Sequence, residues 1–199
     1  MSDFTNAIIL DFESTCDDQK TIKPQEIIEF PSVVLDLESL QLTAEFEAFV
    51  RPVHHPELTP FCRELTAITQ SEVARAEPFA AVFQKHQEWM RQHDLTSGNA
   101  LFVTCGDWDL NVMLPAQCAV SPTEIKRIPS IYRRWHNIKR SYVEVMNVKK
   151  APGMAKMLKA LDIKLTGHHH RGIDDCRNIA TLLTTLIKRG AQFGVTGER

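Results

Sequence analysis

A short run near the N-terminus, around which the rest of the chain is organised, reads Ile8-Ile9-Leu10-Asp11-Phe12-Glu13. It begins with apolar, partly β-branched residues, which is typical of a buried β-strand. Because side chains alternate between the two faces of a strand, Asp11 and Glu13 point the same way. Two buried carboxylates on one face repel each other, and a divalent cation relieves that repulsion. The pattern therefore indicates a candidate metal site, with a strand end that emerges into water as the alternative.

The composition indicates one soluble domain over residues 1–199, since 43% of the chain is hydrophobic and can build an ordinary core. No apolar run approaches the roughly 20 residues that span a membrane. Residues 1–6 lack the basic and apolar regions of a signal peptide. The five cysteines are scattered, without a Cys-x-x-Cys pair. We therefore expect reduced thiols in a cytoplasmic protein, or a nuclear one if the host is eukaryotic.

Charge is unevenly distributed along the chain. Residues 1–60 contain three Lys or Arg and twelve Asp or Glu, whereas residues 126–150 contain eight Lys or Arg and one acid, Glu144. This asymmetry can mark a polyanion-binding face beside an acidic metal site. It favours nucleic-acid binding, although a solvated basic surface would give the same counts.

The order of predicted elements indicates an α/β layer fold with one mixed sheet. Strands are expected over residues 8–13, 26–36, 42–50 and 99–104, with a fifth ending at Leu165. The first three strands should form an antiparallel meander, with a bulge or an edge at Pro31. Asp107 can cap a helix that runs to about Ala119. Further helices are expected over 60–66, 78–93, 131–146 and 153–161. Another is expected from 71 or 72 to 76, and the last from 173 or 174 to 189, ended by Gly190.

The last predicted helix carries another inward carboxylate. Its apolar stripe covers residues 179–187, and Asp175 lies four residues before Ile179 on the same face. The helix dipole partly stabilises an acid in the first turn, which still needs a partner. His170 lies five residues before Asp175, on a loop bounded by Gly167 and Gly172 that is free to move.

Three features together resemble the DEDDh family of 3′–5′ exonucleases. They are the His-x-x-x-x-Asp spacing, the Asp-x-Glu of the first strand and an Asp after the fourth strand. The resemblance is closer still to the branch that trims histone mRNA ends, ribosomal RNA ends and small interfering RNAs. It implies a ribonuclease-H-like mixed five-stranded sheet, three antiparallel strands and then parallel ones, flanked by helices. The matching stretches follow the family's order through nearly the whole chain, over residues 11–16, 26–31, 49–52, 65–70, 108–110 and 172–180.

The resemblance implies four metal-binding carboxylates and a general base, namely Asp11, Glu13, Asp109, Asp175 and His170. Helical geometry leaves Asp107 and Asp109 open, and the Trp-Asp match favours Asp109. The family's two-metal scheme uses two Mg2+ ions, for which Mn2+ can substitute. In that scheme Asp11 bridges both ions, Glu13 and Asp175 complete the site of the attacking water, and Asp109 supports the second ion. Neutral His170 takes the proton of that water.

Residues that meet the terminal nucleotide are also implied, namely Ser14, Thr15, Phe61, Thr66 and Trp108. Phe61 and Trp108 match positions where the family packs that nucleotide, although either can be an ordinary core aromatic. Glu29 is expected to be structural. Zinc is not expected at His168 to His170, because three consecutive histidines cannot comfortably reach one ion.

The predicted function is that of a 3′–5′ exoribonuclease acting on single-stranded 3′ ends and releasing nucleoside 5′-monophosphates. One alternative is an exodeoxyribonuclease of the same family, because RNA or DNA 3′ ends fit the same motifs. The other is a binding module that has kept the fold without turnover. The presence of all five catalytic residue types argues against the binding module.

Overall fold

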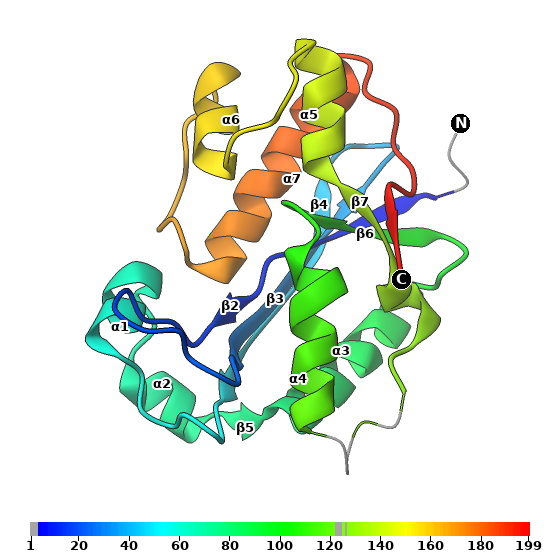
Figure 1. Cartoon of the computed structure of the whole chain (residues 1–199). Coiled ribbons are helices and arrows are strands. Elements are labelled where there is room, and N and C mark those ends of the chain that lie inside the picture. Colours follow the sequence, from blue (N-terminus) through cyan, green and yellow to red (C-terminus); the bar gives the residue numbers. More distant parts are fainter. Residues whose placement is uncertain (1–3, 122–124, 126) are drawn as a thin grey trace.

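The structure is a computed structural model that describes residues 4–121, 125 and 127–199. Within these residues one mixed sheet runs in the order β5-β4-β3-β1-β6-β7-β8, and β2 also pairs with β3 (Figure 1). The strands are β1 (Asn6–Leu10), β2 (Glu13–Ser14), β3 (Ile27–Asp36), β4 (Leu42–Arg51), β5 (Glu77–Pro78), β6 (Ala100–Thr104), β7 (Arg134–Asn137) and β8 (Gly197–Glu198).

Helices lie on both faces of this sheet and at one end of it (Figure 1). They are α1 (Pro60–Thr66), α2 (Gln70–Arg75), α3 (Phe79–Gln92), the π-helical turn η1 (Asp109–Met113), α4 (Leu114–Val120), the 3-10 turn η2 (Ser130–Arg133), α5 (Ile138–Met146), α6 (Met154–Ala160) and α7 (Gly172–Lys188). No described helix is long and apolar enough to cross a membrane.

The expected fold class and meander are confirmed. Strand β3 pairs antiparallel with both β1 and β4, and β6 and β7 then continue the sheet in parallel from β1. Pro31 lies in an interior strand and not at an edge. It stands opposite the break between β1 and β2, because Leu10 pairs with Ser32 and Glu13 pairs with Glu29. The interruption in the ladder falls where the chain reaches Asp11 and Phe12.

The prediction of a strand ending at Leu165 is wrong, because the described residues around Leu165 form no strand. The remaining long strand is β7, which lies inside the helix expected over residues 131–146. Adjacent Trp135 and His136 are both buried, as in a strand covered on both faces, so β7 lacks the alternation that reveals a half-buried strand. Three two-residue strands, β2, β5 and β8, raise the number in the described sheet from the expected five to eight.

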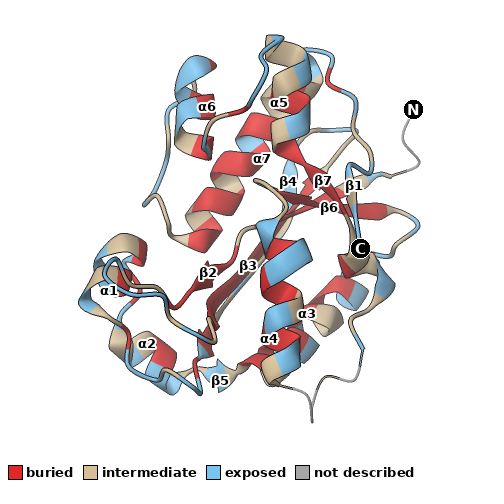
Figure 2. Cartoon of the chain, in the orientation of Figure 1, coloured by how far each residue is buried: buried red, intermediate tan, exposed pale blue. Residues whose placement is uncertain are grey.

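Two clusters of buried apolar side chains pack against the sheet, and Figure 2 shows that its central strands are largely buried. Ile8 and Phe30 belong to the cluster that includes the buried side chains of α3 and α4. Ile9 and Val33 belong to the opposite cluster, with those of α5, α6 and α7. This alternation along β1 follows from the strand period of two. Helix α3 contributes the buried side chains of Phe79, Trp89 and Met90.

Local signals set the ends of the helices next to the site. The Thr59 hydroxyl accepts the N–H of Cys62, and Pro60 occupies the first turn of α1. Helix α7 is followed by Gly190, as predicted, whose φ of 96° is the left-handed conformation that glycine favours. The first turn of α7 lies near the end of β1, and the helix runs from there along one face of the sheet to a last turn beside α5 (Figure 1).

Candidate active site

The end of β1, the turn η1 and the first turn of α7 meet at one cavity of about 400 Å³. All five residues of the expected catalytic set line it, namely Asp11, Glu13, Asp109, His170 and Asp175. Carboxylate oxygens of Asp11, Glu13 and Asp175 lie within 4.8 Å of one another. The fold therefore brings together side chains that are up to 164 positions apart in the chain, between 11 and 175.

The structure separates the roles of Asp107 and Asp109. Asp109 is buried, and its Oδ1 accepts the backbone N–H of Phe12 at 2.9 Å, which holds it against the end of β1. Asp107 does not cap the helix as expected. Its Oδ1 instead accepts the Trp135 indole N–H at 2.8 Å and an amide N–H of Asn137 at 3.0 Å. Asp107 therefore fixes η1 to β7, and Asp109 faces the cavity.

Glu29 sets the position of the first turn of α7. It has no exposed surface, and its carboxylate accepts the N–H groups of Gly172 at 2.9 Å and Ile173 at 3.1 Å. Arg171 Nε lies 3.3 Å from the same carboxylate. A side chain at Gly172 would place its Cβ 2.7 Å from the Asp11 carbonyl oxygen. The glycine therefore lets α7 approach β1 closely, and Glu29 has the structural role expected of it.

The carboxylates of the cavity are poorly compensated by the protein. Burial, and then repulsion from Asp109 and Asp175, raises the pKa of Asp11 well above its ordinary value. Burial and the Asp11 charge raise the pKa of Glu13 to about 10. Burial raises the pKa of Asp109 to about 6, and it also raises the pKa of Asp175. A divalent cation would offset the repulsion between these carboxylates, and carboxylate oxygens are the ligands that hard cations prefer. These acidic residues can therefore hold a divalent metal ion.

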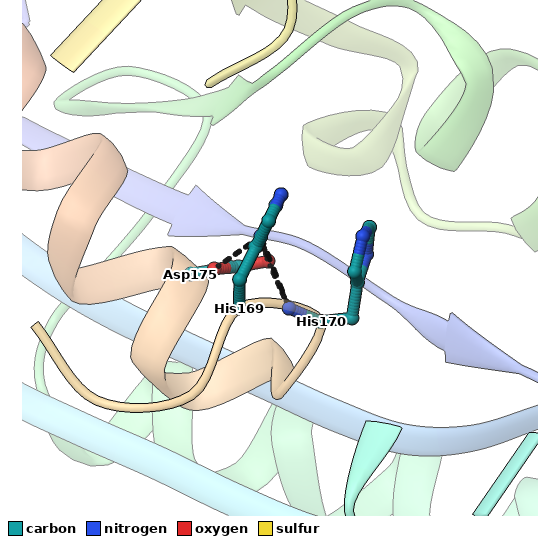
Figure 3. A group of neighbouring side chains, drawn as sticks. All are labelled: His169, His170 and Asp175. Atoms are coloured by element: carbon teal, nitrogen blue, oxygen red, sulfur yellow. Dashed lines mark hydrogen bonds and ion pairs between the residues drawn. The ribbon is translucent and has the colours of Figure 1, made fainter. Parts of the chain in front are cut away.

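The histidine loop approaches Asp175 through two neighbouring residues (Figure 3). Nδ1 of His169 lies 3.1 Å from Oδ2 of Asp175, and the backbone N–H of His170 donates to the same oxygen at 2.9 Å. The two imidazole rings stack with centroids 3.9 Å apart. Burial, followed by repulsion from His169, lowers the pKa of His170. A lowered pKa keeps this imidazole neutral, the form that accepts a proton.

Among the residues of the cavity, His169 and Lys139 are not distinguished by the sequence. His169 looked equivalent to His168, because no spacing rule distinguishes neighbours on a loop. Lys139 belongs to the basic stretch already noted, but its contact with the cavity depends on where α5 starts. It lines the cavity, and its charge lowers the pKa of both Asp11 and Asp109 against the larger effect of burial.

The residues expected to meet the nucleotide fall into two groups. Ser14 and Trp108 line the cavity, and the Trp108 ring is exposed enough to be reached. Phe61 is half-buried on α1, one turn before Leu65, which does line the cavity.

Thr15 and Thr66 do not line the cavity, and their expected contacts with the nucleotide, through the backbone in the case of Thr15, stay predictions. Thr66 has no exposed surface, and its hydroxyl donates to the Cys62 carbonyl and accepts the N–H of Ile68. Thr15 is also buried, and its hydroxyl accepts the N–H of Glu26. Both hydroxyls therefore hold the backbone in place.

Comparison with known protein families matches residues 8–183 to the family described as Exonuclease. The chain is 42% identical over 193 residues to human "ERI1 exoribonuclease 3", covering 96% of this chain and 56% of that protein. It is 34% identical over 190 residues to human "3′-5′ exoribonuclease 1", covering 94% of this chain and 54% of that one. The chain thus spans about half the length of the curated relatives it matches.

Solved structures show the same architecture. The nuclease domain of 3′hExo, described as a DEDDh family member bound to rAMP, matches with a TM-score of 0.91 and 32% identity over 98% of both chains. A 3′-exonuclease described as recognising the histone mRNA stem-loop matches with a TM-score of 0.91 and 31% identity, covering 98% of this chain and 68% of that one.

Proposed function

This chain belongs to the Exonuclease family, and we propose that it is a metal-dependent 3′–5′ exoribonuclease. The observation that carries the proposal is the convergence of four mutually repelling carboxylates and His170 on one cavity. In this proposal residues 1–199 form a single exonuclease domain of a cytoplasmic or nuclear protein. The relatives named exoribonucleases, at 34–42% identity, support RNA as the substrate.

We propose Mg2+ as the ion of this site, with Mn2+ able to substitute. Asp11, Glu13, Asp109 and Asp175 would hold two ions, because they offer oxygen ligands whose ionised forms the protein alone stabilises poorly. When bound, such ions stabilise the charge that develops on a phosphate and its leaving oxygen. Lys139 supplies a fixed positive charge at the same cavity and favours the approach of a phosphate.

His170 is the proposed general base. Its lowered pKa leaves the imidazole neutral at pH 7, so that it can accept a proton from the water that attacks the terminal phosphodiester. The hydrogen bond from its backbone N–H to Asp175 holds the loop beside the carboxylates. Attack of that water cleaves the bond between phosphorus and the 3′-oxygen, so each turnover releases a nucleoside 5′-monophosphate.

Single-stranded 3′ ends are the proposed substrate. The exposed Trp108 ring at the cavity offers a surface on which an unpaired base can stack, worth ~1–3 kcal/mol. Ser14 lines the same cavity beside Glu13, where its backbone can meet the terminal sugar. Phe61 is proposed to border the site from α1, one turn from Leu65.

The test is hydrolysis of single-stranded RNA labelled at either its 5′ or its 3′ end, with Mg2+ or with EDTA. We expect the 5′ label to pass through a ladder of shorter products, the 3′ label to leave at once as a mononucleotide, and EDTA to stop both reactions. Matched DNA and blunt duplex RNA should react more slowly. Faster hydrolysis of DNA would favour the exodeoxyribonuclease, and tight RNA binding without hydrolysis would favour the binding module.

A further inference from the structure

We propose that Cys16 and Cys62 form a redox-sensitive dithiol, which closes to a disulfide in the presence of peroxide and thereby inactivates the neighbouring cavity. The two residues come from different elements. Cys16 follows β2, and Cys62 lies in α1. The disulfide is independent of the proposed exoribonuclease function, whereas the loss of activity rests on it.

A single hydroxyl group joins the backbones of the two cysteines. Thr59 Oγ1 donates to the Cys16 carbonyl oxygen at 2.7 Å and accepts the backbone N–H of Cys62 at 3.0 Å. Cys62 Sγ lies 3.7 Å from the carbonyl oxygen of Ser14, two residues before Cys16. The buried apolar cluster around α1 contains Cys62, and Cys16 packs against it. The segment after β2 is therefore held directly against α1.

The thiol groups also meet each other. A hydrogen bond from the Cys16 thiol lowers the pKa of Cys62 to about 7, while the same pairing, together with burial, raises the pKa of Cys16. A thiolate is the reactive form of cysteine, so a lowered pKa of Cys62 beside a second thiol favours oxidation of the pair. Joining the sulfurs requires them to approach to about 2.05 Å.

The pair lies at the wall of the candidate active site. Cys16 is half-buried and lines the cavity together with Glu13, Ser14 and Leu65. Leu65 lies on α1, three residues after Cys62. Contraction of the two sulfurs to bonding distance moves α1 and the segment after Glu13 relative to each other. It also removes the thiol hydrogen that points to the Ser14 carbonyl oxygen. The disulfide therefore changes the wall that the 3′ nucleotide must contact.

The reaction balances with one molecule of hydrogen peroxide. The two thiols give up two electrons and two protons as the sulfur–sulfur bond forms, and the peroxide oxygen–oxygen bond breaks. The oxygens take up those protons, and the products are one disulfide and two water molecules. A dithiol such as dithiothreitol reverses the step by exchange. In a reducing compartment such a bond forms only transiently, as in redox-sensing proteins.

The experiment treats the full chain with a small excess of hydrogen peroxide, with and without later dithiothreitol. Peptide mapping under non-reducing conditions identifies the linkage, and hydrolysis of 5′-labelled RNA gives the activity. We expect a peptide joining Cys16 to Cys62, a rate reduced at least tenfold, and recovery with dithiothreitol. Each activity is expressed as a ratio to the same variant before oxidation.

The variants Cys16→Ser and Cys62→Ala should each lose most of the sensitivity to peroxide, and two variants are used because Cys62 is buried and its replacement can impair folding. Cys118→Ser is the matched control, since Cys118 lies in α4, and it should remain as sensitive as the wild type. Absence of the Cys16–Cys62 peptide overturns the proposal. An unchanged rate of RNA hydrolysis in a fully cross-linked sample would refute the proposed inactivation by the disulfide. A wild type inactive before oxidation refutes the proposed function, and the peptide map then still decides whether the dithiol closes.

Discussion

Asp175 is contacted by the side chain of His169 and by the backbone of His170. Nδ1 of His169 and the amide nitrogen of His170 lie 3.1 Å and 2.9 Å from the same oxygen, Oδ2 of Asp175 (Figure 3). The His170 ring is stacked on the His169 ring and faces the cavity. This arrangement makes His169 a partner of one carboxylate and leaves His170 available to a water molecule.

Replacing His170 with alanine should therefore lower the hydrolysis rate by roughly 10²–10⁴-fold, the usual contribution of a general base. His168→Ala is the matched control, because its side chain is exposed, and its rate should stay close to that of the wild type. His169→Ala should cost less than about tenfold, since it removes a contact to Asp175 but no proton acceptor. Steady-state rates with one RNA and saturating Mg2+ measure all three. An essential His168 or His169 beside a dispensable His170 would show that the His-x-x-x-x-Asp register is wrong.

Asp11→Asn should abolish hydrolysis and raise the stability of the metal-free protein. The pKa of Asp11 is higher in the folded protein than in the unfolded chain. The free energy of unfolding therefore falls as the pH rises from the unfolded pKa towards the folded pKa. Asparagine does not ionise, so the variant does not lose this stability. Thermal unfolding in EDTA at pH 7 measures the gain, expected to be at least about 2 °C. Saturating Mg2+ should raise the wild-type midpoint by about 5 °C or more and that of the variant by much less. Equal stabilisation of both proteins by Mg2+ would argue against Asp11 as a ligand.

Glu29→Gln should lower both stability and turnover although Glu29 does not line the cavity. The change weakens two hydrogen bonds from the start of α7 and removes the buried partner of Arg171, which should cost at least about 2 kcal/mol. The displaced first turn carries Asp175, so the rate should fall as well.

The control for Glu29 is Glu47→Gln, which removes the half-exposed partner of the same arginine. That pair should contribute less than about 1 kcal/mol, because solvent screens it. Urea unfolding and RNA hydrolysis are measured on both variants. A Glu29→Gln protein as stable and as active as Glu47→Gln would contradict the positioning role.

His86 should make the fold sensitive to mild acid. Its ring nitrogens contact Ser32 Oγ at 2.9 Å and Tyr132 OH at 2.7 Å, and burial lowers its pKa to about 3. Below the unfolded pKa of about 6.5, the unfolded chain binds a proton here that the folded chain does not. The free energy of unfolding should therefore fall by about 1.4 kcal/mol for each pH unit below 6.5, down to the folded pKa.

The variant His86→Gln cannot titrate, so it isolates this contribution. It should be less stable than the wild type at pH 7, because it disturbs two buried hydrogen bonds, and its stability should depend less on pH between 6.5 and 4.5. Urea unfolding in EDTA at several pH values measures both proteins. Parallel pH profiles would mean that another group causes the acid sensitivity.

The sequence predicted those site residues whose position depends on the periodicity of a single strand or helix. The strand period placed Asp11 with Glu13, and the stripe of α7 placed Asp175 on its buried face. His169 and Lys139 were missed because their contacts depend on how a loop and the start of α5 meet distant elements. Strand β7 was missed for a related reason: it is buried on both faces and runs directly into α5.

Crystals soaked with Mn2+ test whether the carboxylates at the end of β1 form a two-metal centre. Anomalous diffraction should show two peaks, each within ~2.0–2.6 Å of an Asp11 carboxylate oxygen. Glu13 and Asp175 should contribute oxygens to one ion and Asp109 to the surroundings of the other. The absence of any peak beside Asp11, at a Mn2+ concentration that supports RNA hydrolysis in solution, would contradict the account.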